Sequence, residues 1–307
     1  MPVVNKQTPP ARKPMPVAKA GSILAKATSI ASLVDDCVHL LLYGRNGIGK
    51  TTFAGQFPKP MLVVGVEPTR TGGSRSIKRS PDTSSLVYGN HFKSVKEFEQ
   101  IGHELLANPA YETVVVDSGT SLDAIVLAEV CGWQDTANLL KWGMVSQDQY
   151  RERSEVMRRI LRPYLNYPRN LVIICNEKDH NPPEGKRNSL VKEAQAESFF
   201  GPAMGGGTVM WTQDSCDFIC QMYMDHETVR VQKTRKVPVA GSKPKDETYY
   251  EDEPTGKFIR RLRMAYHPNY SARSRGEEAG AVPDYIEGKT PKEMYDKFMK
   301  VVRGEKV

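Results

Sequence analysis

The segment of this sequence best suited to chemistry is residues 44–51, which read GRNGIGKT and match the pattern GxxxxGK[ST] in full. The apolar run 38–43 precedes it, and the helix-forming residues 51–54 follow it. In a strand, glycine-rich loop and helix of this kind, successive backbone N–H groups and the helix N-terminus point at one phosphate group. The segment therefore predicts a site for a nucleoside triphosphate.

Side chains of this loop have expected roles in holding ATP and Mg²⁺. Lys50 would reach the β- and γ-phosphates, and the Thr51 hydroxyl would hold the metal ion. The residues expected to surround the nucleotide are Gly44, Asn46, Gly47, Ile48, Gly49, Lys50, Thr51 and Thr52. ATP and Mg²⁺ are therefore the predicted ligands.

Polar residues also follow three further apolar runs that read as strands. They are Glu67 after 61–66, Asp117 at the end of 113–117, and Asn176 after 171–175. In an open α/β sheet, right-handed crossovers bring the carboxyl ends of the parallel strands to one edge, where ligands bind. We therefore expect these three side chains to meet the phosphate loop.

Each of the three has a candidate role and an ordinary alternative. Asp117 is suited to be a Walker B acid that orders metal-bound water, and the alternative is a helix N-cap. Glu67 could orient or deprotonate the attacking water, or be a solvated loop acid before Pro68. Asn176 could sense the γ-phosphate and pass that state to the following loop, or simply cap its strand.

The rest of the sequence supplies the elements that must position these residues. Strands are expected at 38–43, 61–66, 84–88, 113–117 and 171–175, and helices near 50–57, 94–108, 120–131 and 147–166. Near-continuous apolar strands alternating with helices indicate a parallel sheet covered on both faces. Later in the chain, antiparallel strands are expected at 216–224, 227–236 and 257–266, and a helix at about 291–303. The predicted fold class is α/β, with a twisted, mainly parallel sheet flanked by helices and with antiparallel C-terminal strands.

Composition divides the chain into four expected parts. Residues 1–20 are rich in Pro, Lys and Val without periodicity, which predicts a disordered basic arm. Residues 21–237 are expected to form the ATPase core, 238–256 a polar linker or hairpin insert, and 257–307 a strand, basic motif and helix that complete the domain.

Net charge and cysteine content give weaker indications. Of the formal charge of +7, the first 20 residues supply +4, so charge alone is weak support for nucleic-acid binding. Five scattered cysteines without CxxC pairs predict reduced, buried thiols rather than a disulfide framework or a zinc site. No apolar run approaches the ~20 residues that a membrane crossing needs, and no signal-peptide core is present, so the cytoplasm is the expected compartment.

These motifs together resemble the RecA/RadA recombinase core. The overall pattern is most similar to the phage-encoded, minimal RecA-like ATPases that anneal single strands, often labelled AAA-type phage nucleotide-binding proteins. The segments that carry the resemblance are GRNGIGKTTFAGQFPKPMLVV, VVVDSGTSL, LVIICNEKD, YSARSRG and VPDYI, within residues 36–286. The chain departs from the pattern at Asn176, where RecA relatives carry Gln and the phage group often His, at Pro68, and in the long polar insert 238–256.

The resemblance implies a RecA-like P-loop ATPase that binds single-stranded DNA and acts in phage recombination or annealing, replication or repair. It also implies DNA-stimulated hydrolysis in the cytoplasm of an infected bacterial host, with a single-strand-binding protein as a candidate partner. Two alternatives stay open. One is a hexameric helicase or loader, and the other is a nucleotide-gated protein scaffold with little turnover.

In RecA-like assemblies, a basic pair from the neighbouring subunit stabilises charge in the transition state. Arg273 and Arg275 lie in the segment that resembles the phage group's terminal basic motif. Lys233 and Arg235 resemble the Lys-x-Arg finger of hexameric relatives. We favour Arg273 and Arg275, and a solvated basic face is the alternative for either pair. Either choice implies a homo-oligomer, a ring or a filament, with nucleotide at the subunit interfaces.

DNA-contacting loops in RecA-type proteins follow the Walker B helix and the next strand. The second loop would fall within 179–208, where cations suit phosphates, aromatic rings suit base stacking and Gly205, Gly206 and Gly207 suit mobility. Its candidate DNA contacts are Lys186, Arg187, Lys192, Phe199 and Phe200. Three glutamates dilute its charge, and a mobile active-site lid is the alternative. The first loop would be 132–148, where buried tryptophans are the alternative.

Overall fold

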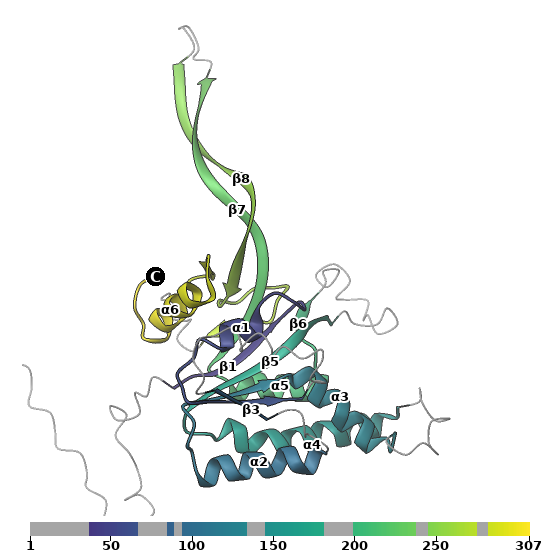
Figure 1. Ribbon diagram of the computed structural model, residues 1–307. Helices are drawn as coiled ribbons and strands as arrows, with labels where there is room; N and C mark the ends of the chain where they lie inside the picture. The colour runs from purple at the N-terminus through teal and green to yellow at the C-terminus, as the bar shows by residue number, and fades with distance from the viewer. Residues whose placement is uncertain are drawn as a thin grey trace, which may run out of the picture. The chain divides into compact units, whose positions relative to one another are not determined.

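One mixed sheet runs through the described residues, which are 37–66, 85–88, 94–133, 145–180, 199–237, 245–274 and 282–307 of the computed structural model (Figure 1). Its strands are β1 (His39–Gly44), β2 (Met61–Gly65), β3 (Ser85–Tyr88), β4 (Thr113–Asp117), β5 (Asn170–Asp179), β6 (Phe200–Pro202), β7 (Phe218–Val237), β8 (Lys245–Arg263), β9 (Arg273–Ser274) and β10 (Tyr285–Gly288). The order across the sheet is β10-β8-β7-β1-β5-β4-β2-β3, and β6 and β9 pair with β5 and β7. The arm predicted for residues 1–20 lies outside the described residues.

Strand direction confirms the predicted fold class. The pairs β1–β5, β1–β7, β2–β3, β2–β4 and β4–β5 are parallel, whereas β8, β9 and β10 pair antiparallel. The helices are α1 (Lys50–Ala54), α2 (Val95–Ala107), α3 (Gly119–Val130), α4 (Gln147–Leu165), α5 (Gly206–Ser215) and α6 (Pro291–Val302). None of the helices among the described residues is long and apolar enough to cross a membrane.

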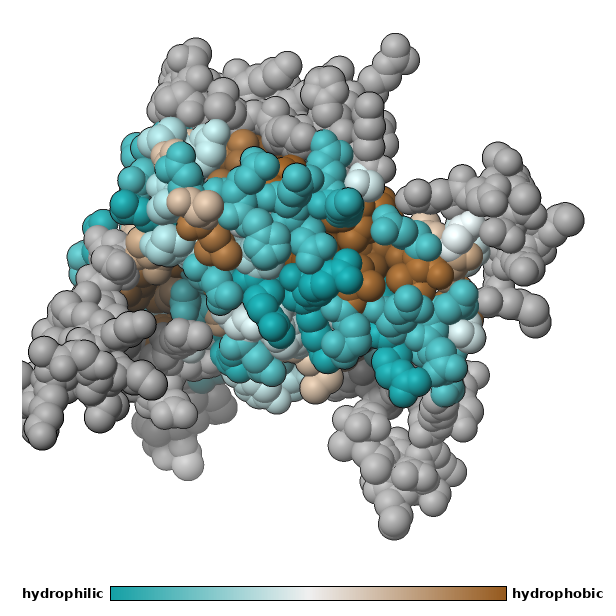
Figure 2. All heavy atoms as spheres, turned by 90° about the horizontal axis from the view of Figure 1, so that it is seen from below, coloured by the Kyte–Doolittle hydropathy of each residue, from teal (hydrophilic) through white to brown (hydrophobic). Residues whose placement is uncertain are grey.

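Each face of the sheet is covered by its own hydrophobic core. Because side chains alternate along a strand, Leu41 and Tyr43 point into one core, and Leu40 and Leu42 point into the other. The first core includes residues of α2, α3, α4 and α5, and the second includes Phe53 of α1 and several residues of α6. Burial on both faces explains why β1, β2 and β4 read as continuous apolar runs. The outer surface on the α2 and α4 side is largely hydrophilic (Figure 2).

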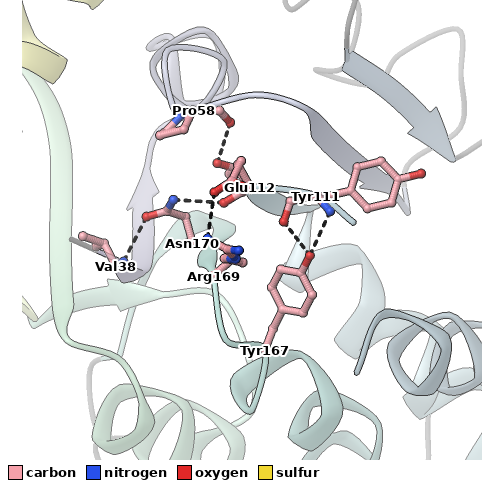
Figure 3. A network of polar contacts seen from close by, with 8 residues as sticks. Val38, Pro58, Tyr111, Glu112, Tyr167, Arg169 and Asn170 are labelled. Atoms are coloured by element: carbon pink, nitrogen blue, oxygen red, sulfur yellow. Dashed lines mark hydrogen bonds and ion pairs between the residues drawn. The ribbon is translucent and has the colours of Figure 1, made fainter. Parts of the chain in front are cut away.

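A network of polar contacts fixes the amino ends of β1, β4 and β5 (Figure 3). Asn170 Oδ1 accepts a hydrogen bond from the Val38 N–H at 3.0 Å, and its Nδ2 donates to the Glu112 carbonyl at 2.9 Å. The Tyr167 hydroxyl donates to the Tyr111 carbonyl at 2.6 Å. A slip of one residue would turn every side chain of a strand to the opposite face. These bonds help to hold the register that aligns the strand ends at the other edge of the sheet.

The C-terminal strands differ from the sequence expectation. The two strands expected at 216–224 and 227–236 are wrong as separate elements, because residues 218–236 belong to the single strand β7. Part of the segment expected as a polar linker or hairpin insert, 245–256, lies in β8, and 238–244 lies outside the described residues. From residue 228 onward, β7 pairs only with β8 and forms a two-stranded ribbon (Figure 1). Most of the described side chains of this ribbon are exposed. A ribbon with solvent on both faces has no apolar alternation for a sequence pattern to detect.

Candidate nucleotide site

The carboxyl ends of the central strands bring the predicted site residues to one edge of the sheet. Gly44, the last residue of β1, lies level with Asn176 on β5 and with Met222 on β7. Asp117 ends β4, the strand on the far side of β5. The Val66 N–H donates to the Asp117 carbonyl at 2.7 Å, so the end of β2 lies at the same edge. Glu67 itself lies outside the described residues.

Two glycines explain why the phosphate loop has its shape. A Cβ atom on Gly44 would lie 2.2 Å from the backbone oxygen of Met222, so only glycine allows β7 to approach this closely. Gly49, the N-cap of α1, has φ +105°, a conformation that side chains disfavour. The loop therefore needs glycine at these positions for its geometry, before any ligand is considered.

Lys50 is buried inside the loop. Its Nζ donates to the carbonyl oxygens of Gly44 at 2.8 Å and Arg45 at 2.9 Å, and lies 3.4 Å from Asn176 Oδ1. Only 7% of this residue is exposed. The positive charge is therefore held at the mouth of the loop, where phosphate oxygens would offer stronger acceptors than neutral carbonyls.

Thr51 and Asp117 are direct neighbours although they come from different elements. The Thr51 hydroxyl donates to Asp117 Oδ2 at 2.9 Å, and both residues are buried. A hydroxyl and a carboxylate side by side form a hard oxygen donor set of the kind that Mg²⁺ prefers. The residues present therefore fit a magnesium ion beside the phosphate loop.

Asn176 connects the loop to the helix after Asp117. Its side-chain oxygen faces Lys50, and its backbone N–H donates to Thr120 Oγ1 on α3 at 2.9 Å. Its carbonyl accepts from the Ala203 N–H at 2.8 Å. A displacement of Asn176 would therefore reach both α3 and the chain that precedes α5.

The sequence profile of the family described as "AAA domain" matches residues 37–275. The chain belongs to the AAA domain family. With the geometry above, this places it among the P-loop ATPases, a class that takes a nucleotide and typically Mg²⁺. No protein with a curated description matches the sequence.

Two solved structures are similar to this AAA domain at low identity. The flagellar accessory protein FlaH from Methanocaldococcus jannaschii is 10% identical, with 81% of this chain and 84% of FlaH covered and a TM-score of 0.35. The RadB recombinase is 15% identical, with 83% of this chain and 89% of RadB covered and a TM-score of 0.35.

Residues that sequence reasoning missed complete the walls of the site. Arg260 on β8 donates from Nε to the Ile48 carbonyl at 2.9 Å. Glu177 lies 3.5 Å from Arg45 and accepts from Gln221 Nε2 at 2.6 Å. Beside the loop, Glu177 and Gln221 border a cavity of about 430 Å³, which Tyr223, Met224, Arg263 and Tyr270 also line. Only Glu177 had a sequence signal, because it follows Asn176 at a strand end.

The three candidate finger residues that the structure describes do not lie at the phosphate loop of their own chain. Arg273 pairs with Ile219 near the amino end of β7, and its guanidinium contacts the Gln213 carbonyl and Asp214 at the end of α5. Lys233 and Arg235 lie in the distal ribbon. Arg275 lies outside the described residues.

The segment expected to be the second DNA loop is partly described. Lys186, Arg187 and Lys192 lie outside the described residues, which stop at His180 and resume at Phe199. Phe199 is exposed at 41%, whereas Phe200 stacks on Tyr270 with ring centroids 5.5 Å apart. Phe199 thus offers its ring to solvent, and Phe200 is engaged in packing. In the expected first loop, Trp133 is partly buried and residues 134–144 lie outside the described residues.

One glycine of that segment, Gly205, has a packing role. Gly205 caps α5, and Gly206 and Gly207 are its first residues. A Cβ atom on Gly205 would lie 1.7 Å from Arg153 Nη2. A buried arginine therefore fills the space beside Gly205.

Arg153 on α4 pairs with Asp123 on α3 beneath the start of α5. Arg153 Nη1 lies 3.4 Å from Asp123 Oδ2, which also accepts from the Gly205 N–H at 3.1 Å. Burial raises the pKa of the Asp123 carboxyl, against the lowering effects of Arg153 and the Gly205 N–H. This buried pair holds α5 against the helix that follows Asp117.

Proposed function

We propose that this AAA domain is a Mg²⁺-dependent ATPase that acts on single-stranded DNA. The observation that carries the hydrolytic part is the hydrogen bond of 2.9 Å between Thr51 and Asp117, beside the buried Lys50. Lys50 and Thr51 begin α1 and Asp117 ends β4, and together they supply a cation for phosphates and two oxygen ligands for a metal.

In the proposed reaction, water attacks the γ-phosphorus of ATP in line with the leaving ADP oxygen. Lys50 and the amides of residues 46–52 bind and orient the phosphates, and Lys50 offsets their charge. Magnesium, held by Thr51 and Asp117, would supply further neutralisation of phosphate charge. Asn176 would report the presence of the γ-phosphate through Lys50 and Thr120.

Two further roles complete the proposal. Glu67 would orient the water and take its proton, and the contact between Val66 and Asp117 supports a position near the metal ligands. A basic pair from a neighbouring subunit would stabilise the transition state. The candidate pairs are Arg273 with Arg275 and Lys233 with Arg235. The active form is then a homo-oligomer with nucleotide at its interfaces.

The DNA-binding part of the proposal rests on where the segment 181–198 is attached. The elements on either side of this segment are β5 and β6, and β6 pairs with β5 at Glu177, Lys178 and Asp179. These residues follow Asn176 directly. Binding of DNA phosphates by Lys186, Arg187 and Lys192 would therefore act on the strand that faces Lys50, and Phe199 would stack on a base. We place this activity in recombination or annealing during phage DNA replication or repair, alongside a single-strand-binding protein.

The decisive experiment is steady-state ATP hydrolysis by the full chain, with and without single-stranded DNA, beside the Lys50→Ala variant. We expect DNA to stimulate turnover several-fold and the variant to lose it. A triple variant, Lys186→Gln with Arg187→Gln and Lys192→Gln, should keep basal turnover and lose the stimulation. Turnover that ignores DNA while ATP still binds would overturn the DNA-directed function, and absence of any turnover would indicate a nucleotide-gated scaffold.

A further inference from the structure

The distal part of the β7–β8 ribbon segregates its charges by strand. Residues 228–237 of β7 contain four cations and no acid, and residues 246–254 of β8 contain five acids and no cation. The cations are Arg230, Lys233, Arg235 and Lys236, and the acids are Asp246, Glu247, Glu251, Asp252 and Glu253. The ribbon therefore has one basic strand and one acidic strand.

Each strand of the ribbon also has a long outer edge that no strand covers in the described part of the chain. β7 pairs with β1 only through Phe218–Met222, and β8 pairs with β10 only through Arg260–Arg263. Farther out, each strand pairs on its inner side with the other. The outer edge of a strand is a template for pairing with another strand.

Contacts within the ribbon stabilise the pairing of its two strands, but they do not cover the outer edges. Lys233 Nζ lies 2.7 Å from Glu251 and 2.6 Å from Glu253, and the Arg230 guanidinium lies 5.3 Å from the Tyr250 ring centroid. Val229 and Tyr250 nevertheless remain 51% and 59% exposed. An isolated two-stranded ribbon is marginally stable in water, so a covering strand would add both hydrogen bonds and apolar burial.

The charge distribution indicates what kind of partner fits. Nucleic acid requires an excess of cations along its contact, and the ribbon's cations are matched by acids on the adjacent strand. Pairing of two β7 edges, or of two β8 edges, would place like charges opposite one another, which destabilises a sheet. Pairing of a β7 edge with a β8 edge places opposite charges together. A second copy of the same chain supplies that complementary edge.

We propose that the ribbons of neighbouring copies join edge to edge, with β7 of one copy against β8 of the next. Such a contact is heterologous, so it repeats around a ring or along a filament and does not stop at a two-fold dimer. The proposal gives the oligomer expected in the proposed function a specific interface. It does not depend on ATP hydrolysis, and its test is a mass measurement.

The test compares chains whose ribbon charges are reversed one strand at a time. The β7 variant carries Arg230→Glu, Lys233→Glu, Arg235→Glu and Lys236→Glu. The β8 variant carries Asp246→Lys, Glu251→Lys, Asp252→Lys and Glu253→Lys. We expect each variant to remain at the mass of one chain, 34.4 kDa, in sedimentation at low salt where the native chain forms larger species. An equal mixture of the two should assemble, because their edges are complementary to each other.

Two controls separate loss of the interface from loss of the ribbon. A chain with both sets of substitutions keeps opposite charges across the ribbon and should assemble with itself but not with the native chain. A variant with Lys292→Glu, Lys300→Glu, Arg303→Glu and Lys306→Glu makes the same change in net charge on exposed positions outside the ribbon, and should assemble normally. A native chain that stays at 34.4 kDa, or a β7 variant that assembles fully, overturns the proposal. A Lys50→Ala chain should still assemble, which separates this outcome from that of the ATPase test.

Discussion

Arg260 Nε donates a hydrogen bond of 2.9 Å to the carbonyl oxygen of Ile48, across a sequence separation of 212 residues. The contact joins the returning strand of the ribbon to the phosphate loop. A Cβ atom on Gly49 would lie 3.4 Å from the same Nε, so the guanidinium rests against two consecutive loop residues. The loop is thus held by its own helix on one side and by β8 on the other.

Replacing Arg260 with methionine should weaken ATP binding without unfolding the chain. The side chain is exposed, so we expect a loss of about 1 kcal/mol, or about fivefold in the ATP dissociation constant. Fluorescent-nucleotide titration measures this directly. Lys257→Met, on the same strand and exposed, is the matched control and should leave affinity unchanged. Equal affinity in both variants would mean that the Ile48 contact has no part in holding the loop.

Asp117→Asn should separate ATP binding from hydrolysis. The amide oxygen can still accept from Thr51, but the negative charge that would hold magnesium is lost. We expect turnover to fall by about 10²-fold or more, with a large increase in the magnesium concentration needed for activity. Nucleotide affinity without magnesium should change little. Asp148→Asn, on the exposed start of α4, is the control, and turnover near the native value in Asp117→Asn would remove the residue from the metal site.

Gly205→Ala and Gly206→Ala should have opposite effects on stability. The first places a methyl group where Arg153 Nη2 lies and displaces a buried ion pair, which should cost about 1–3 kcal/mol. The second meets no atom within 4 Å and removes a helical glycine, which should be neutral or stabilise by up to about 1 kcal/mol. Urea unfolding of both variants provides the comparison. Equal stability of the two would contradict close packing at the start of α5.

Asp123 should make the free energy of unfolding depend on pH. Its pKa is raised in the folded chain, so between its ordinary value of 3.8 and the raised value the folded state binds more protons than the unfolded state. The stabilising contribution of this group is complete below 3.8 and decreases as pH rises through that window. The native chain should therefore lose stability relative to Asp123→Asn as pH rises from about 4. A difference between the two that stays constant with pH would contradict the raised pKa.

Most of the central sheet could be predicted because burial on two faces leaves a strong signal. The strand expected at 113–117 has the observed bounds, and Asp117 and Asn176 lie at the edge where the topology rules place them. The phosphate loop could also be predicted, because its backbone geometry requires glycine at fixed positions and so leaves a recognisable motif. The polar residues at strand ends that form a site can therefore be predicted from sequence when the strands are parallel and buried.

Contacts between distant segments could not be predicted in the same way. Arg260 lies in a stretch of cations and apolar residues, KFIRRLR at 257–263, and nothing in this sequence indicates that its partner is Ile48. Phe200 and Phe199 are identical in type and adjacent, yet only the packing of Tyr270 decides which ring is engaged. Gly205 looked like a flexible hinge because the arginine that fills its missing side chain comes from another helix.

The neighbours of β1 determine when the nucleotide site can form during synthesis. β1 pairs with β5 and β7, so Gly44 reaches its observed position only beside Asn176 and Met222. The motif GRNGIGKT emerges from the ribosome long before these partners, and Arg260 follows later still. Since long-range strand pairing is slow and depends on distant residues, we expect a nascent chain that ends before β7 to carry the whole motif and to bind no ATP. Nucleotide binding in this AAA domain is then a property of a chain that already includes β7 and β8, and ATP present during translation would stabilise only chains that have reached that point.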